Sequence, residues 1–175
     1  MAMSGPMAQQ HGVFARPRSL DELAALSESE LLNQYLSGVA PAPTDLHGDL
    51  HGRMLAVRGA GRIWSALLQA FAAWRHFPWR GKSFVARGGS RGDGINRVFG
   101  DRARWFRFET FVAPSRVDGK PAFQLDYDNS HNPFFIRAVK DELRRVAPGL
   151  FLGRAYITLW GQARFALYFA LSTAK

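Results

Sequence analysis

The sequence predicts an α+β protein that is mainly antiparallel β. We expect a small barrel or half-barrel, with helices before it and one further helix inserted between its strands. Three observations predict this class. The spacing of apolar residues is helical before Pro78 and has a period of two after it. Turn signals typical of hairpins separate the alternating runs. The 14 phenylalanines supply a large apolar interior, which a curled sheet of about eight strands can enclose.

The chain of 175 residues has the length of one domain with a single core. Residues 1–18 are expected to form a flexible arm. They do not resemble a secretion signal, because no apolar run follows a charged start. No run of about 18 apolar residues is present that could span a membrane. Cytoplasmic localisation is therefore the expectation.

Residues 19–76 are expected to be a helical segment that packs on the barrel. Two capping boxes, each a serine followed three residues later by a glutamate, predict helices over 20–26 and 28–37. The boxes are Ser19 with Glu22 and Ser27 with Glu30. A third helix is predicted over 62–76, where "RIWSALLQAFAAWRH" spaces its apolar residues helically before Pro78 ends it.

Residues 77–175 are expected to form the antiparallel barrel-like domain. Polar and apolar residues alternate over 105–112 and 122–128, and Asp118-Gly119 between them is a strong hairpin signal. A second hairpin is predicted around Gly161-Gln162, between "LFLGRAYITLW" and "RFALYFALS". Further strands are predicted near 79–87 and 95–100, on either side of "RGGSRGDG".

One helix, over about 133–146, is predicted to interrupt the sheet. Asn132 is a suitable cap and Pro133 suits the first helical position. The spacing of Arg137, Asp141 and Arg145 predicts a ladder of salt bridges on its exposed face. Its predicted apolar side consists of Phe135, Ile136, Val139, Leu143 and Val146.

Three stretches of this region resemble an uncharacterised group of small bacterial lipocalin-like proteins. They are "FPWRGKSF", "DGKPAFQLDYDNSHNP" and "IRAVKDELRRVAPGLFLGRAYI". They are also distantly similar to the GXWXG/DUF4334 arrangement, in which a Trp-x-Gly-Lys strand precedes a late "DYD"-like strand. The resemblance covers about residues 77–172. It implies a lipocalin-like barrel, and the family brings no agreed activity.

The densest polar group lies in "LDYDNSHNPFFIR", at a predicted strand-to-helix junction. Tyr127, His131 and Asp126 there combine a phenol, an imidazole and a carboxylate. Such groups perform general acid–base catalysis when burial shifts their pKa values towards neutrality. We therefore take them as candidate catalytic residues. The alternative interpretation is that they only form a turn and a helix cap, because Asp, Asn, Ser and His are common in turns.

A ligand-binding cavity is predicted from the apolar faces of the strands. The surplus of phenylalanine indicates an elongated apolar cavity, bordered by arginines that would engage an acidic or carbonyl-bearing end of a ligand. Arg107 and Glu109 share a strand face that is expected to point outward, because charges inside would be costly. The candidate ligand-binding residues are Phe106, Phe108, Phe123, Leu125, Arg107, Arg137, Phe165 and Phe169.

The stretch "LHGDLHGRML" at 46–55 has the pattern of a phosphotransferase catalytic loop. A kinase interpretation fails, because the 46 residues before the motif contain no lysine and no nucleotide-binding lobe. His47 and His51, which alternate with Asp45 and Asp49, could cluster as metal ligands on a helix face, but Gly48 and Gly52 disfavour a helix, and a polar, glycine-punctuated entry into the fold suffices to explain the stretch. A turn or short strand is expected here, and neither a metal nor a cofactor is predicted.

The net charge of +9 leaves two classes of function open. The segment 75–107 alone carries +7, which would attract phosphates of a membrane or of nucleic acid. Nucleic acid is disfavoured as a partner, because Trp105 and Arg107 are a single instance of aromatic and basic residues interleaved on a strand face, and no RNP-like motif is present. The preferred function is binding, with or without conversion, of a small apolar ligand in the barrel. The alternative is a basic interaction module for an anionic membrane or nucleic acid.

Overall fold

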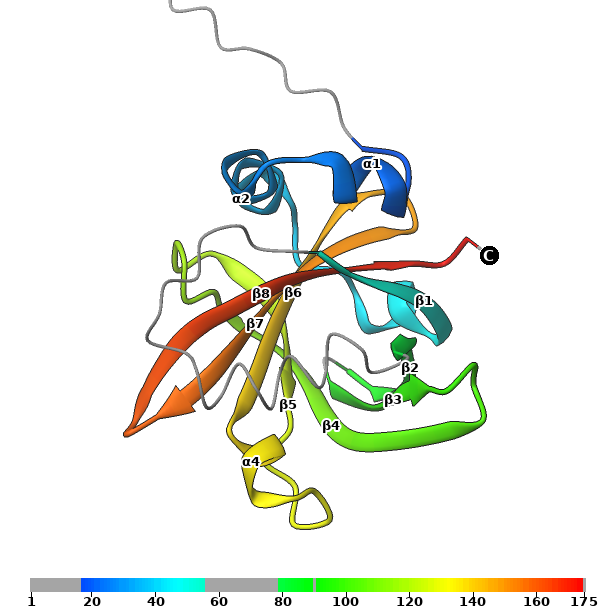
Figure 1. Cartoon of the computed structure of the whole chain (residues 1–175), viewed down its shortest axis with the longest axis vertical. Coiled ribbons are helices and arrows are strands. Elements are labelled where there is room, and N and C mark those ends of the chain that lie inside the picture. The colour runs from blue at the N-terminus through cyan, green and yellow to red at the C-terminus, as the bar shows by residue number, and fades with distance from the viewer. Residues whose placement is uncertain (1–16, 56–78, 90, 175) are drawn as a thin grey trace, which may run out of the picture.

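The computed structural model describes residues 17–55, 79–89 and 91–174, and in this part the chain forms a closed antiparallel barrel (Figure 1). Each strand pairs with the next along the chain, and β1 pairs with β8 to close the sheet. This topology is consistent with a lipocalin-like barrel. The strands are β1 Gly48–Leu55, β2 Trp79–Gly88, β3 Arg91–Val98, β4 Ala103–Pro114, β5 Pro121–Asp126, β6 Val139–Ala147, β7 Leu150–Leu159 and β8 Gln162–Ser172.

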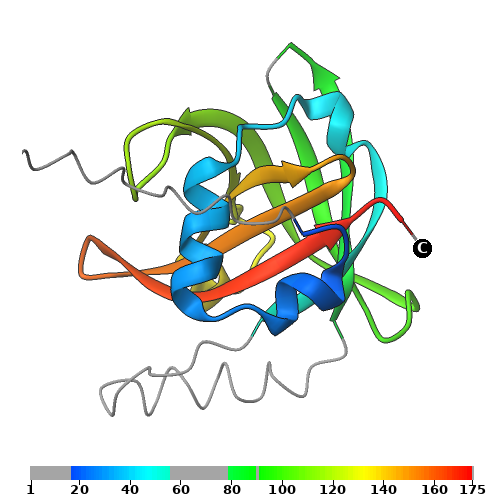
Figure 2. The same ribbon diagram turned by 90° about the horizontal axis from the view of Figure 1, so that it is seen from above.

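The helices α1 (Leu20–Ala25) and α2 (Glu28–Ser37) confirm two predictions. Both interactions of the predicted capping box at the start of α2 are formed. A 3-10 turn, η1 (Pro43–Leu46), then leads into β1. Figure 2 shows α1 and α2 lying across the outer face of β7 and β8. The helices and the strands pack together through an outer apolar cluster. This cluster includes Leu23, Leu31, Tyr35, Leu55, Val146, Leu150, Leu152, Tyr168 and Ala170.

The barrel begins earlier in the chain than residue 77, the expected boundary. β1 lies within the segment 19–76, which was assigned to helices, and it pairs with both β2 and β8. Residues 48–55 therefore form a strand that closes the sheet. The predicted helix over 62–76 and most of the predicted arm over 1–18 lie outside the described residues.

The predicted helix over 133–146 is wrong. Only α4 (Phe134–Arg137) is helical, and the chain then enters β6 (Figure 1). The spacing of Val139 and Leu143 fits both structures, because residues four apart share a face in a helix and in a strand alike. Asn132 does not cap the helix. Its side-chain amide donates to two backbone carbonyls, at 2.7 and 2.8 Å.

The predicted salt-bridge ladder on that helix is also absent from the structure. Arg137 instead contacts Asp128 at 2.7 Å, and Arg145 contacts Asp45 at 3.0 Å. Asp141 points into the barrel, because it shares the inward face of β6 with its neighbours two residues away in either direction. A residue expected in solvent is thus buried in the interior.

Both predicted hairpins are present. β7 and β8 are joined by Trp160 and Gly161, which both have positive φ, as a tight two-residue hairpin requires. The turn between β4 and β5 contains Gly119, whose φ is 70°. Asp118 in the same turn accepts hydrogen bonds from the buried guanidinium of Arg144, at 2.7 and 2.9 Å. The turn is therefore attached to the outer face of β6.

Aromatic rings fill much of the barrel interior, and glycines on neighbouring strands make room for them. A Cβ atom on Gly94 would lie 2.2 Å from the ring of Phe108, and one on Gly153 would lie 2.1 Å from the ring of Phe169. Each of these rings therefore lies flat over a glycine on the strand beside it. The inner cluster includes Leu46, Leu50, Phe84, Phe108, Phe123, Leu125, Tyr127, Ile136, Val139, Leu143, Phe151, Ala155, Phe169 and Leu171.

Candidate functional site: a buried polar cluster in the barrel

Four polar side chains meet inside the barrel, each from a different part of the sheet. Lys82 on β2 and Asn96 on β3 are direct cross-strand partners. Tyr127 follows the last residue of β5, and Asp141 lies on β6. Each has the inward orientation because strand residues alternate between the two faces of a sheet. All four are buried, with at most 3% of the residue exposed.

The ammonium group of Lys82 is the centre of the cluster. Its Nζ donates to Asn96 Oδ1 at 2.9 Å, to Asp141 Oδ2 at 3.2 Å and to the hydroxyl of Tyr127. These acceptors use the three protons of an ammonium group. Rings of Trp79, Phe108, Tyr127 and Phe169 surround the same nitrogen, with centroids at 5.1–5.5 Å.

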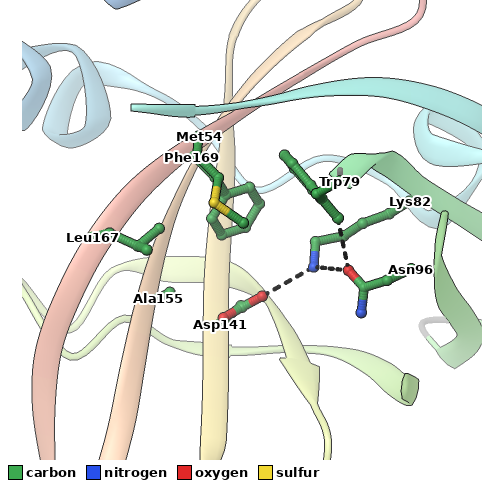
Figure 3. Close-up of a pocket in the computed structure, with 8 residues that line it drawn as sticks. All are labelled: Met54, Trp79, Lys82, Asn96, Asp141, Ala155, Leu167 and Phe169. Atoms are coloured by element: carbon green, nitrogen blue, oxygen red, sulfur yellow. Dashed lines mark hydrogen bonds and ion pairs between the residues drawn. The ribbon is translucent and has the colours of Figure 1, made fainter. Parts of the chain in front are cut away.

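The other polar atoms are connected to one another as well. The hydroxyl of Tyr127 donates to Asp141 Oδ2 at 3.2 Å and accepts from Asn96 Nδ2 at 3.3 Å. Trp79 Nε1 donates to Asn96 Oδ1 at 3.0 Å (Figure 3). The network orients Lys82 and Asp141 towards each other, so the two groups act as one unit.

Burial shifts the pKa values of Lys82 and Asp141 in opposite directions. Removal from water lowers the pKa of Lys82, and the attraction of Asp141 opposes this change. Removal from water also raises the pKa of Asp141, against the attraction of Lys82. Burial raises the pKa of the Tyr127 hydroxyl, so this group stays neutral. Both shifts within the pair favour its neutral forms, which lowers the cost of moving the proton from the amine to the carboxylate.

One oxygen of the cluster is left over. Asp141 Oδ1 is buried and has no hydrogen-bond partner among the residues that the structure describes. An unsatisfied buried acceptor costs about 1–3 kcal/mol, and more when it is charged. Such an atom is therefore a position where a ligand or a water molecule would be stabilised.

A cavity adjoins this carboxylate. Its empty volume is about 260 Å³, including space open to solvent. Figure 3 shows Lys82 and Asp141 on one side of it and apolar side chains of β1, β7 and β8 on the other. The lining residues are Met54, Trp79, Lys82, Asn96, Asp141, Ala155, Leu167 and Phe169. Met54, Trp79 and Leu167 are only partly buried, so the cavity lies close to the surface.

The structure brings only one of the three candidate catalytic residues into this site. Tyr127 is in the cluster. Asp126 faces outward and forms an ion pair with Lys140. His131 lies exposed in the loop after β5, where its Nδ1 is 3.0 Å from Asn129 Oδ1. The structure therefore does not bring Asp126 and His131 together with Tyr127, since Asp126 points to the opposite face of the sheet and His131 lies in the loop.

The candidate ligand-binding residues also separate into groups. Phe108, Phe123 and Leu125 are 1% exposed and belong to the inner cluster, with Phe106 packed against it. Phe169 lines the cavity. Most of these rings contact one another: Phe108 lies 5.4 Å from Phe84 and 5.1 Å from Tyr127, measured between ring centroids. These packed rings fill space that the sequence predicts to be part of an elongated cavity.

Three other candidates lie away from the cavity. Phe165 packs in the outer cluster. The pairing of β7 with β8 has a register shift between Phe165 and Leu167, so these two residues, although two apart in the sequence, point to opposite faces of the sheet. Arg107 is exposed on β4, on the outward face expected for it. Arg137 is exposed and paired with Asp128. These three residues do not line the described cavity.

The histidine-rich stretch at 46–55 has a role in the sheet. Asp49 on β1 accepts from Ser83 on β2 and, at 3.3 Å, from Arg104. The hydrogen bond from Ser83 lowers the pKa of Asp49, with help from the nearby cations. Within the described part of the chain, no three side chains of His, Cys, Asp or Glu gather as metal ligands would.

Within the described residues of the basic segment 75–107, several cations are buried or paired with carboxylates. Lys82 is inside the barrel, and Arg97 is buried with its guanidinium on Asp101 at 2.7 and 2.8 Å. Arg87 forms an ion pair with Asp93, and Arg104 one with Asp49. Much of the local charge is therefore neutralised within the fold.

Sequence reasoning missed Lys82, Asn96 and Asp141. A signal for Lys82 was present, since it shares a strand face with Phe84 in "WRGKSF". A lysine on an apolar face is unusual and marks a buried partner. Asp141 gave no such signal once its segment was interpreted as a helix.

Comparisons with known proteins support the fold. No family model matches the chain, and no curated protein matches it. A crystal structure of a protein from Thermomonospora curvata is similar, with a TM-score of 0.51 and 16% identity over 86% of this chain and 89% of that chain. At this identity the similarity shows the fold alone. In the described residues, no helix is both long and apolar enough to cross a membrane.

Proposed function

We propose that the barrel binds a small, largely apolar molecule whose polar end, a hydroxyl or carbonyl group, lies against Lys82 and Asp141. The observation that carries this proposal is the unpartnered Oδ1 of Asp141 beside a cavity with apolar walls. Apolar walls with a few convergent polar groups are typical of small-molecule sites. The space that the centre of a water molecule can occupy there is only about 20 Å³, which favours a compact ligand over a long acyl chain.

The charges of the cluster favour a neutral polar end over an acidic one. The three protons of Lys82 are already donated to three acceptors, so this cation has none to offer an incoming carboxylate. The carboxylate of Asp141 would repel a second one. A hydroxyl group, by contrast, can donate to Asp141 Oδ1. The sequence predicts a ligand with an acidic or carbonyl-bearing end. We therefore propose that this end of the ligand is uncharged.

Three ligands of similar size test the proposal: phenol, toluene and benzoate. A hydrogen bond to a charged group contributes about 1.5–3 kcal/mol, so phenol should bind about tenfold or more tightly than toluene. Benzoate should bind most weakly. Affinities can be measured by calorimetry and by ligand-observed NMR on the full chain.

Matched variants test whether the buried polar cluster, and not the outer surface, favours phenol over toluene. In the double variant Lys82→Met with Asp141→Leu, phenol should lose its advantage over toluene. The control Asp126→Asn, on the outer face, should keep it. Equal binding of phenol and toluene by the unaltered protein would refute the role of the polar end. Absence of saturable binding for all three ligands would refute the cavity as a binding site.

A second candidate, contact with an anionic membrane, is supported by exposed aromatic residues at one end of the barrel. Trp160 is 93% exposed and Phe134 is 84% exposed. The hydrogen bond from Thr158 N to Ala138 O, at 2.8 Å, places their two segments side by side. Arg164 is exposed in the same hairpin as Trp160. Tryptophan with adjacent cations is typical of membrane-interface contacts.

Vesicle binding tests this second candidate. The protein should sediment with vesicles of phosphatidylglycerol more than with vesicles of phosphatidylcholine, and Trp160→Ser should weaken this binding. Equal sedimentation of the variant and the unaltered protein would exclude the hairpin as a membrane contact.

A further inference from the structure

We propose that Lys82 captures small apolar aldehydes covalently, as an imine formed inside the barrel with Asp141 as the proton carrier. This inference rests on the proposed function, since the aldehyde must first enter the cavity. It assigns a chemical reaction to the site and defines the ligand class as aromatic or aliphatic aldehydes without a charge.

The geometry places an amine and an acid side by side at the wall of an apolar cavity. Lys82 Nζ lies 3.2 Å from Asp141 Oδ2, and both side chains line the cavity (Figure 3). Their side chains are only 4% and 5% exposed. A carbonyl group that entered beside them would have an amine for its carbon and a carboxyl group for its oxygen.

The amine must lose a proton before it can act as a nucleophile. Burial lowers the pKa of Lys82 and raises that of Asp141, so transfer of the proton from Nζ to the carboxylate is less costly than in water. Desolvation in an apolar pocket is a known means of activating a lysine. After the transfer the proton lies on Oδ2, the oxygen that faces Nζ, and the carboxyl group can pass it to a carbonyl oxygen beside the pair.

The reaction then balances without a further reagent. The lone pair of Nζ forms a bond with the aldehyde carbon while the carbonyl oxygen takes the proton from Asp141, which gives a carbinolamine. The nitrogen next loses a proton, and the hydroxyl group leaves as water after its own protonation. The products are an imine on Lys82 and one water molecule, and Asp141 carries the proton between the two atoms.

The other lysines of the chain lack this environment. Lys120 is exposed in the turn between β4 and β5, and Lys140 forms an ion pair with Asp126 on the outer face. Lys175 is the last residue of the sequence. Each unit by which the pKa of an amine falls raises its neutral fraction at pH 7 about tenfold. Lys82 should therefore react ahead of the other three.

Reductive trapping tests the inference on the full chain. The protein is incubated at pH 7 with benzaldehyde and cyanoborohydride, which converts an imine into a stable secondary amine. Intact mass and peptide mapping then locate the benzyl group. We expect labelling of Lys82 to exceed that of each other lysine, because burial lowers the pKa of its amine. The variant Lys82→Arg, checked for native circular dichroism, should lose this label and keep only weak surface labelling.

A parallel measurement separates failure of the inference from failure of the proposed function. Benzyl alcohol has the size of benzaldehyde but forms no imine, and its binding is followed by ligand-observed NMR. Saturable binding of the alcohol without a benzyl group on Lys82 would overturn covalent capture and leave the binding function intact. Failure of both would overturn both. Equal labelling of all four lysines would also overturn the inference, because it would show ordinary surface reactivity.

Discussion

Replacing Lys82 with methionine should strongly destabilise the barrel, because it leaves a buried carboxylate without its cation. Asp141 would keep only the donor hydroxyl of Tyr127 at 3.2 Å, while its second oxygen already lacks a partner in the described chain. Removing one member of a buried ion pair costs about 3–5 kcal/mol. Domains of this size have a free energy of unfolding of about 5–15 kcal/mol, so the variant should fold with a small margin.

Removing the unpaired charge as well should recover most of the free energy of unfolding that Lys82→Met loses. The double variant Lys82→Met with Asp141→Leu replaces both charges by apolar side chains of similar volume. Such replacements are often neutral or stabilising by about 1–4 kcal/mol relative to the buried pair. Urea titrations at pH 7, followed by circular dichroism, measure the free energy of unfolding of both variants. Arg137→Met, which removes an exposed pair with Asp128, is the matched control and should change the midpoint little.

The loss in the single variant should depend on pH. Without Lys82, nothing of equal strength opposes the effect of burial, which already raises the pKa of Asp141 in the folded protein. A raised folded pKa favours the folded state fully below the unfolded pKa of about 3.9, and this advantage is lost as pH rises through the folded pKa. The gap in stability between Lys82→Met and the unaltered protein should therefore widen from pH 4 to pH 7. A gap that is independent of pH, or no larger than that of the control, would refute this account of the pair.

Three further variants test the packing around the site. In Gly153→Ala, the new Cβ would lie 2.1 Å from the ring of Phe169, so this ring, which lines the cavity, must shift; phenol binding by calorimetry should weaken, and unchanged affinity would contradict this geometry. Phe108→Ala should lower the free energy of unfolding in urea by about 3–5 kcal/mol, because the ring is buried in the inner cluster. A loss below about 1 kcal/mol would mean that the ring is not packed as described. Ser27→Ala removes the capping box of α2 and should cost about 1 kcal/mol in the same titration, whereas no change would show that the cap contributes nothing.

The local features of the fold were determined by the sequence itself. Ser27 and Glu30 begin α2 through contacts three residues apart, and Gly161 permits the positive φ of a two-residue hairpin. The alternation over 122–128 places Phe123 and Leu125 inside, together with Tyr127. Each of these features depends on residues that are neighbours in the chain. Their physical cause, a cap, a backbone angle or a two-residue period, is therefore present before any tertiary contact forms.

The candidate site was decided by the tertiary structure. Val139 and Leu143 fit a helix and a strand equally well, and pairing with β5 and β7 selected the strand. That choice turned Asp141 inward, 59 residues along the chain from the lysine that it meets. Closure of the sheet then surrounded the ammonium group of this lysine with aromatic rings from β2, β4 and β8. A buried charge is stable only beside its partner, and partners so far apart in the sequence meet only when the barrel closes.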